Sequence, residues 1–513
     1  MKELEEMLKK IVASVGKEAI YGGGAVFILG FFIHMFIFAN HYPTYSGLNL
    51  FINDGKWHAI EGRWFSAVVE KCTSFVTIPT FIGLLSLFFW AVSYALLIRL
   101  FDIKSHLMVF LAAGVFISYP SIAGYYTFLY TAHCFALGCM LSICGVCLLL
   151  KNSLKTSIGG CICFIFALAT YQNTISIAMV IAFMMVAFSI IDGEEILVIM
   201  KRILRYSLVI VISFLVYYVS FKAYLLFSNT DSYRDFSISF ETILKGIIKC
   251  YGGAYWFWIW GTVFSLKSGR IIVLLLSTVL IIEVIIIFYN RNRSWSNAFF
   301  RCIMLLGLIV LLPIVANFVF LVSPDEARTY RQFISYLIIF LAPFIILERY
   351  QSDITSFWKK KGIKEIIFEF VILIYSAVTI LFFDITDNVA YMNMHLQYEK
   401  EYSLAVRIVD RIENTDGYES GMPVMIILRK DYGHLYGGKL ESQLDKYIPG
   451  MEQQGWGIMS NPIGIKNFIE EFIQTDINIV NVETDMEKLS HLEKWPSKDC
   501  TQIMDGVLYI YIS

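Results

Sequence analysis

Long apolar runs recur through the first three quarters of the sequence, with polar segments between them. A helix needs about 20 apolar residues to cross the hydrocarbon core of a bilayer, and eleven runs reach or approach that length. These runs lie at about 20–39, 77–99, 105–119, 126–150, 157–170, 174–191, 205–227, 270–288, 301–322, 332–347 and 365–384. The pattern therefore predicts a polytopic α-helical membrane protein with about 11 transmembrane helices. The glycines Gly22–Gly24 would let another helix approach the first span closely.

After residue 384 the pattern changes. Residues 403–412 have helical spacing, whereas 423–428, 477–482 and 506–512 are short β-rich stretches typical of strands. We therefore expect two domains, a transmembrane module over 1–384 and a small extracytoplasmic α/β domain over 385–513.

Composition agrees with a membrane protein. Hydrophobic residues make up 57% of the chain and charged residues 16%, and the mean hydropathy is +0.64. The net charge of −1 argues against a nucleic-acid partner. The ten cysteines lack the paired spacing of a zinc site, so we interpret them as buried thiols.

The distribution of Lys and Arg predicts the orientation. If the N-terminus is cytoplasmic, most of these residues fall in cytoplasmic segments, and Lys359–Lys361 is the strongest group. An odd number of spans then places the C-terminus outside. The main outer loops would be 40–76, 229–269 and 323–331.

The first outer loop contains FINDGKWHAIEGRWF, residues 51–65. If a helix begins near Asp54, then Asp54, His58 and Glu61 share one face, with Arg63 on the opposite face. That helix would present an acidic face to a cavity. The alternative is a surface helix that Asp54 caps and the tryptophans anchor.

The outer loop SPDEARTYRQF, residues 323–333, contains two arginines at the expected membrane boundary. Arginine suits a phosphate because its planar fork donates two parallel charge-assisted hydrogen bonds. Arg328 and Arg331 could hold a lipid phosphate while its tails stay in the bilayer. The alternative is a surface ion pair of Asp325 with Arg328, together with arginine side chains that extend to the membrane–water interface.

A third polar segment, TYQN at 170–173, forms a tight turn between two spans. Polar groups at this depth must be satisfied by protein or water. Tyr171 and Gln172 could hydrogen-bond the hydroxyls of a sugar, or they could cap the two helices.

Together these segments resemble the bacterial O-antigen-type glucosyltransferase II family, whose fold is GT-C-like. The resemblance extends over essentially the whole chain and depends on the order of short motifs around the spans. The matching segments are GRW at 62–64, ATYQN at 169–173, SPDEARTYRQF at 323–333, NVAYMNMHLQYEKEYSLAVRIVDRI at 388–412 and WPSKDCTQIMDGVLYIYI at 495–512.

The resemblance implies a hexosyltransferase that moves glucose, or a similar hexose, from a polyprenyl-phosphate donor onto a growing cell-surface glycan. The reaction would take place on the outer face of the bacterial cytoplasmic (inner) membrane. It also implies a catalytic carboxylate in the first outer loop. Related enzymes often have two acids together there, whereas this chain has Asn53 and Asp54. Asp54 is therefore the expected base and Glu61 the expected second acid.

Other residues receive roles on the same basis. A single base would give an inverting displacement, in which fixed cations stabilise the leaving phosphate. The resemblance leaves room for a divalent metal, although no metal ligands are assigned. The donor phosphate is assigned to Arg328, Arg331 and Arg63, and the sugar or acceptor to His58, Trp57, Tyr171, Gln172, Asp325 and Tyr330.

Two other functions compete with this assignment. A flippase or transporter of a lipid-linked sugar would need a polar path through the membrane, and the predicted inner loops are short and basic. A scaffold of a polysaccharide assembly complex would instead use the tail to bind a partner.

Overall fold

The computed structural model describes most of the chain. The described residues are 15–48, 52, 55–232, 239–260, 267–291, 295–359, 366–428, 443–444, 447–448, 451, 459, 461–480, 492–493 and 495–512. The chain forms two compact units. One contains Met1–Ala39 and Asp54–Asn388, and the other contains Asn40–Asn53 and Val389–Ser513. The sequence predicted one boundary at 384/385, whereas the structure also assigns 40–53, part of the first predicted outer loop, to the second unit.

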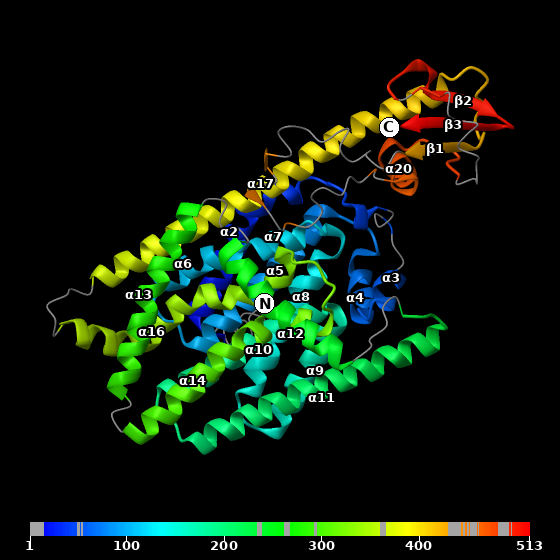
Figure 1. Ribbon diagram of the computed structural model, residues 1–513. Helices are drawn as coiled ribbons and strands as arrows, with labels where there is room; N and C mark the ends of the chain where they lie inside the picture. Colours follow the sequence, from blue (N-terminus) through cyan, green and yellow to red (C-terminus); the bar gives the residue numbers. More distant parts are fainter. Residues whose placement is uncertain are drawn as a thin grey trace, which may run out of the picture. The chain divides into compact units, whose positions relative to one another are not determined.

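The first unit is helical throughout its described part (Figure 1). Its longer helices are α2 (Lys17–Phe38), α5 (Pro79–Phe101), α6 (His106–Ile117), α8 (Ala132–Leu149), α9 (Leu154–Thr170), α10 (Ile175–Ile191), α11 (Ile196–Ser228), α12 (Phe240–Tyr255), α13 (Lys267–Arg291), α14 (Trp295–Ala316), α16 (Tyr336–Lys359) and the N-terminal part of α17 (Ile366–Glu413), whose residues from 389 belong to the second unit. Its shorter elements are α3 (Lys56–Ile60), α4 (Trp64–Val69), η2 (Glu70–Thr73), α7 (Pro120–Tyr126), η3 (Leu129–Thr131), η4 (Gln172–Thr174), the π-helical turn η5 (Trp256–Trp260), α15 (Phe318–Val322) and η6 (Tyr330–Phe333).

Eight helices in the described part of the chain are long and apolar enough to cross a membrane, or nine if the bent pair α6 and α7 counts as one span. The protein is therefore a multi-pass membrane protein. Each of the eleven apolar runs contains helix, but the count of eleven spans stays a prediction. The run 105–119 corresponds to the bent pair, whose two helices meet at 46°, and the run 157–170 forms only the 17-residue α9.

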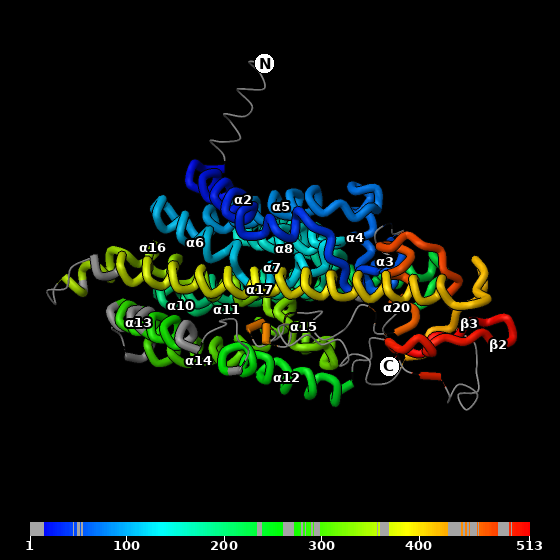
Figure 2. Tube along the Cα trace, turned by 90° about the horizontal axis from the view of Figure 1, so that it is seen from above, coloured from blue at the N-terminus to red at the C-terminus, as the bar shows by residue number. Residues whose placement is uncertain are grey.

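Glycines permit close packing between the first spans. A Cβ on Gly22 would lie 2.9 Å from the ring of Tyr94, and one on Gly83 would lie 2.4 Å from the ring of Phe38. These contacts join α2 to α5, which lie together on one side of the helical unit, whereas α12 and α14 lie on the other (Figure 2). The predicted close approach is confirmed at Gly22, but a Cβ on Gly24 would meet nothing within 4 Å.

The helical unit has two polar ends. The connection 171–174 between α9 and α10 marks the first end, and the connection 192–195 between α10 and α11 marks the second. The hydroxyl of Ser66 donates to the carbonyl of Thr170 at 2.9 Å, which places the loop after α3 at the first end.

The second unit contains a small mixed sheet, as the sequence predicted. Strands β1 (Val424–Leu428), β2 (Thr501–Met504) and β3 (Val507–Ile512) have the order β1-β3-β2, with β1 parallel and β2 antiparallel to β3. Helix α20 (Pro462–Phe468) and the C-terminal part of α17 supply buried apolar side chains to the same core. The expected strand 477–482 contributes a single bridge, between Ile479 and Val424.

Candidate functional site

Two arginines from distant parts of the chain lie against one aromatic ring at the first end. The guanidinium carbon of Arg63 is 5.0 Å from the ring centroid of Tyr171, and that of Arg331 is 5.5 Å from the same centroid. Arg331 also lies 4.4 Å from the ring of Phe128 and is only 9% exposed. A ring holds a guanidinium by attraction to its face and does not neutralise the charge.

A carboxylate accompanies this pair of cations. Glu61 Oε2 is 2.9 Å from Arg63 Nη1, and both side chains are largely buried. The Nε atom of Arg63 and the indole nitrogen of Trp64 are also buried without a hydrogen-bond partner among the described residues. Buried donors of this kind are costly unless a ligand satisfies them. The group Glu61, Arg63, Tyr171 and Arg331 therefore brings two guanidinium groups and a carboxylate together, and we call it the first-end cluster.

The turn between α9 and α10 fixes the backbone of this cluster. Gln172 Nε2 donates to the carbonyl of Glu61 at 3.0 Å, and Asn173 Nδ2 donates to the carbonyl of Arg331 at 3.2 Å. Gln172 also donates to the hydroxyl of Tyr217 at 2.9 Å. The turn therefore ties the first loop to the 323–333 loop, and its amide side chains position these segments.

The expected continuous helix from Asp54 is wrong. Helix α3 ends at Ile60, and a turn at Glu61 and Gly62 separates it from α4. Gly62 has φ +84°, which favours glycine, and a Cβ there would lie 2.5 Å from the hydroxyl of Tyr217. The turn removes Glu61 from a shared helical face with His58. Asp54 itself lies outside the described residues.

A second carboxylate lies deeper at the same end. His58 Nε2 is 3.0 Å from Glu70 Oε1, and the two side chains are 2% and 1% exposed. The pair is close but not aligned as a hydrogen bond, and His58 Nδ1 has no hydrogen-bond partner among the described residues. The ring of His58 also stacks on Tyr130 at 5.9 Å. Glu70 was not among the predicted site residues, although an acid inside the apolar stretch VVEKC was a signal.

Three other predicted residues have different surroundings. Tyr330 is buried, and its carbonyl accepts a hydrogen bond from Ser121 at 2.6 Å. Trp57 is 45% exposed. Arg328 is exposed and lies beside α12, where a Cβ on Gly252 would be 2.8 Å from its Nη2 atom. The two arginines of the 323–333 loop thus point to different places.

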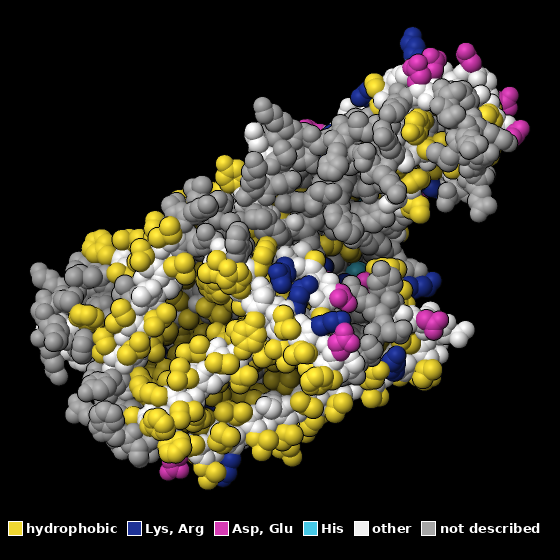
Figure 3. All heavy atoms as spheres, in the orientation of Figure 1, with side chains coloured by type: hydrophobic (Ala, Val, Ile, Leu, Met, Phe, Trp, Pro, Cys, Tyr) yellow, Lys and Arg dark blue, Asp and Glu magenta, His cyan; other side chains and the backbone are white. Residues whose placement is uncertain are grey.

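Charged side chains lie on α12 and beside it at the exposed surface. Lys245 pairs with Glu241 at 2.7 Å, and the hydrogen bond and charge of Glu241, together with the weaker charge of Asp325, raise the pKa of Lys245. Figure 3 shows basic and acidic side chains gathered on a face that is otherwise largely hydrophobic. Asp325 is exposed and belongs to this surface rather than to the first-end cluster.

Asp387, on α17, is a further carboxylate that the sequence interpretation missed. It is fully buried, and neither of its oxygens has a hydrogen-bond partner among the described residues. One turn earlier, the ring of Phe383 packs on Tyr119 at 5.5 Å, and Tyr119 donates to the carbonyl of Phe333 at 2.8 Å. Asp387 therefore extends from a helix that borders the 330–333 segment. The two acids in FFDITDN at the end of an apolar run were its signal.

Among the described residues, no group of three or more His, Cys, Asp or Glu side chains is placed to hold a metal ion.

Comparison with known proteins identifies the family. Curated proteins and solved structures gave no match. A family profile described as Glucosyl transferase GtrII matches residues 35–347, which is more than half of the chain and includes the whole first-end cluster. The chain therefore belongs to the glucosyl transferase GtrII family, and it is a membrane-embedded glycosyltransferase.

Proposed function

We propose that the protein transfers glucose, or a similar hexose, from a polyprenyl-phosphate donor to a cell-surface glycan. The reaction takes place at the outer face of the cytoplasmic membrane, with the N-terminus inside and a GT-C-like transmembrane module. Family membership supports glucosyl transfer. The apolar helices support a donor whose hydrocarbon tail lies in the bilayer.

The proposed chemistry is a single inverting displacement. A carboxylate takes the proton of the acceptor hydroxyl while the hydroxyl oxygen bonds to the anomeric carbon. The bond between that carbon and the phosphate oxygen breaks, and its electron pair goes to the lipid phosphate. Asp54 is the proposed base, with Glu61 as the second acid.

One observation carries the proposal: Arg63 and Arg331 lie on the same Tyr171 ring, and the Glu61 carboxylate pairs with Arg63. As the phosphate leaves, negative charge grows on its oxygens, and fixed guanidinium groups stabilise that charge more than they stabilise the bound donor. The backbone hydrogen bonds from Gln172 and Asn173 hold these groups in place before the donor binds. Arg328 lies beside α12, so we propose it as a phosphate contact for a donor that extends to that helix.

Replacing the carboxylates tests the base. Asp54→Asn and Glu61→Gln are expressed separately, and transfer of labelled glucose from polyprenyl-phosphate glucose to polysaccharide is measured in membrane vesicles. Loss of the base is expected to slow transfer by about 10²–10⁴-fold. The matched control is Asp102→Asn, because Asp102 is an exposed acid at the C-terminus of α5 that pairs with Lys104.

The outcomes separate the two acids. Loss of transfer in Asp54→Asn alone supports Asp54 as the base, and loss in Glu61→Gln alone moves the role to Glu61. If both variants insert normally and transfer glucose at the control rate, neither acid is the base. Asp387→Asn is then the next variant to measure.

A further inference from the structure

A large cavity opens at the second end of the helical unit. Its volume is about 800 Å³, and it lies among the ends of α5, α8, α10 and α11 and the connection between α8 and α9, with one side chain from α16. The site proposed for glycosyl transfer lies at the opposite ends of these helices. The cavity therefore needs an explanation of its own.

The lining of this cavity is strongly basic. Six of its side chains are Lys or Arg and one is acidic. The basic residues are Arg99, Lys151, Lys201, Arg202, Arg205 and Arg349, and the acid is Glu194. A cavity with this balance favours an anionic ligand.

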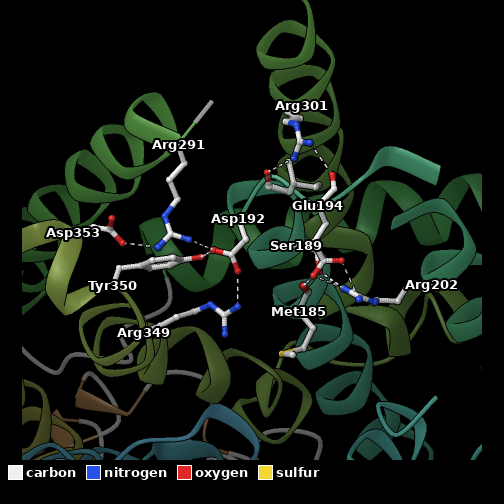
Figure 4. Close-up of polar contacts among 11 residues, drawn as sticks. Met185, Ser189, Asp192, Glu194, Arg202, Arg291, Arg301, Arg349, Tyr350 and Asp353 are labelled. Carbon is white, nitrogen blue, oxygen red and sulfur yellow. Dashed lines mark hydrogen bonds and ion pairs between the residues drawn. The ribbon is translucent and has the colours of Figure 1, made fainter. Parts of the chain in front are cut away.

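Only part of this positive charge is neutralised. Arg202 pairs with Glu194 at 3.0 Å, and Arg349 pairs with Asp192 (Figure 4). The other four cations, by contrast, have no carboxylate within ion-pair distance in the described part of the chain. One of them, Arg205, donates to the amide oxygen of Asn152 and has a buried Nε atom with no hydrogen-bond partner among the described residues.

Much of the rest of the lining is apolar. Leu96, Leu148, Met185 and Phe188 belong to it, and all four come from membrane-spanning helices close to their second-end termini. Phosphate headgroups of the bilayer lie at this depth, and the acyl chains lie next to the apolar part of the helices. A ligand that fits both parts of the lining has a phosphate head and hydrocarbon tails.

We infer that this cavity binds an anionic phospholipid, with its phosphate headgroup against the unpaired Lys and Arg side chains. The acyl chains lie along the leucines and Phe188. Basic pockets between membrane helices at the cytoplasmic side are a known mode of anionic lipid recognition, and the second end is the end predicted to be cytoplasmic. The inference does not depend on the proposed glycosyl transfer.

A competing explanation is that these cations only orient the protein in the membrane, since Lys and Arg are concentrated in cytoplasmic loops generally. Lys155 separates the two explanations. It is exposed on the first turns of α9 at the same end, but it does not line the cavity. An orienting charge would act alike at Lys155 and at the cavity residues, whereas a binding site would not.

The experiment measures lipid binding by the purified full-length protein in detergent. Dioctanoyl phosphatidylglycerol, dioctanoyl phosphatidylcholine and inorganic phosphate are titrated separately, and bound lipid is counted by native mass spectrometry. The cavity variant is Lys151→Gln with Lys201→Gln, because both side chains are exposed and outside any ion pair of the described residues. The control is Lys155→Gln. Inorganic phosphate binding is followed by the shift in thermal unfolding.

The original protein is expected to bind phosphatidylglycerol in preference to phosphatidylcholine. Loss of two surface cations is expected to weaken phosphatidylglycerol binding about thirtyfold, and Lys155→Gln is expected to leave it unchanged. Equal binding of the two lipids, or equal affinity in the double variant, would overturn the inference. Stabilisation by inorganic phosphate at the same concentrations as phosphatidylglycerol would assign the cavity to a free anion instead of a lipid.

Discussion

The two ends of the helical unit hold their arginines in opposite ways. At the first end, Arg63 and Arg331 lie on the ring of Tyr171, and Glu61 pairs with Arg63. At the second end, Asp192 lies between Arg291 and Arg349, which bind its two oxygens. The first pair of arginines thus shares an aromatic ring, whereas the second pair shares a carboxylate.

This difference distinguishes a proposed binding site from a structural network of ion pairs. Figure 4 shows Asp192 between the two arginines, while Arg291 continues to Asp353 and Arg301 donates to backbone carbonyls near the end of α10. These contacts join α10 to α13, α14 and α16. Stacking on a ring positions a guanidinium through its face, and Arg63 keeps a buried Nε donor with no hydrogen-bond partner among the described residues. We therefore propose that the first end binds an anion, whereas the Asp192 group mainly holds helices together.

Among the variants that test this comparison, the largest expected effect comes from removing the buried cation of the first end. Arg331→Gln keeps a polar side chain but removes the charge, and we expect glucose transfer to fall by about 10²–10³-fold, as when a group that stabilises transition-state charge is lost. The rate is measured as label transferred from polyprenyl-phosphate glucose in membrane vesicles, per amount of inserted protein.

Two further variants serve as comparisons for Arg331→Gln. Lys71→Gln removes an exposed cation from the same end and is expected to change the rate less than threefold. Arg328→Gln tests whether the second arginine of the loop also serves the donor, because the structure places it beside α12. A folded Arg331→Gln protein with a rate near that of Lys71→Gln would contradict the phosphate role of Arg331.

Much of the fold was predictable because apolar run length reports directly on membrane helices. The run 174–191, for example, lies in a helix long and apolar enough to cross a membrane. The short run 105–119 forms α6, and Pro120 begins the second helix of the bent pair after a break. The alternation of side chains along 506–512 similarly predicted β3. The four-residue β2 contains too few apolar residues to be predicted from the sequence.

The site was predictable in its segments but not in its partners. Three polar loops between spans do meet at one end, as their place in the predicted topology required. Which arginine turns inward could not be seen, because Arg328 and Arg331 are chemically alike and only packing distinguishes them. Glu70 and Asp387 lie in or beside apolar stretches, which was a signal, but only the structure shows that both side chains are buried.

A smaller effect is expected from Gly62→Ala, which strains the turn that presents Glu61 and Arg63. A left-handed residue with a Cβ costs about 1–2 kcal/mol, and the Cβ would also press on the hydroxyl of Tyr217. We expect a lower thermal unfolding temperature and a roughly tenfold slower transfer, since 1.4 kcal/mol is about a factor of ten. Gly24→Ala is the matched control, because that helical glycine has open space around it. Equal behaviour of the two variants would show that the turn does not set the geometry of the cluster.

The smallest expected effect tests the other side of the comparison. Asp192→Asn leaves a polar group for Tyr350 but removes the charge that Arg291 and Arg349 share. These arginines are 35% and 38% exposed, so water screens the pairs and we expect a loss of about 1 kcal/mol in the free energy of unfolding. Asp353→Asn should cost less, because in the described part of the chain Asp353 pairs with Arg291 alone. Thermal unfolding in detergent measures both losses, and the transfer rate per folded molecule should stay unchanged. A slower rate at unchanged stability would mean that the second end takes part in catalysis. The distinction between a binding site at the first end and a structural network of ion pairs around Asp192 would then be wrong.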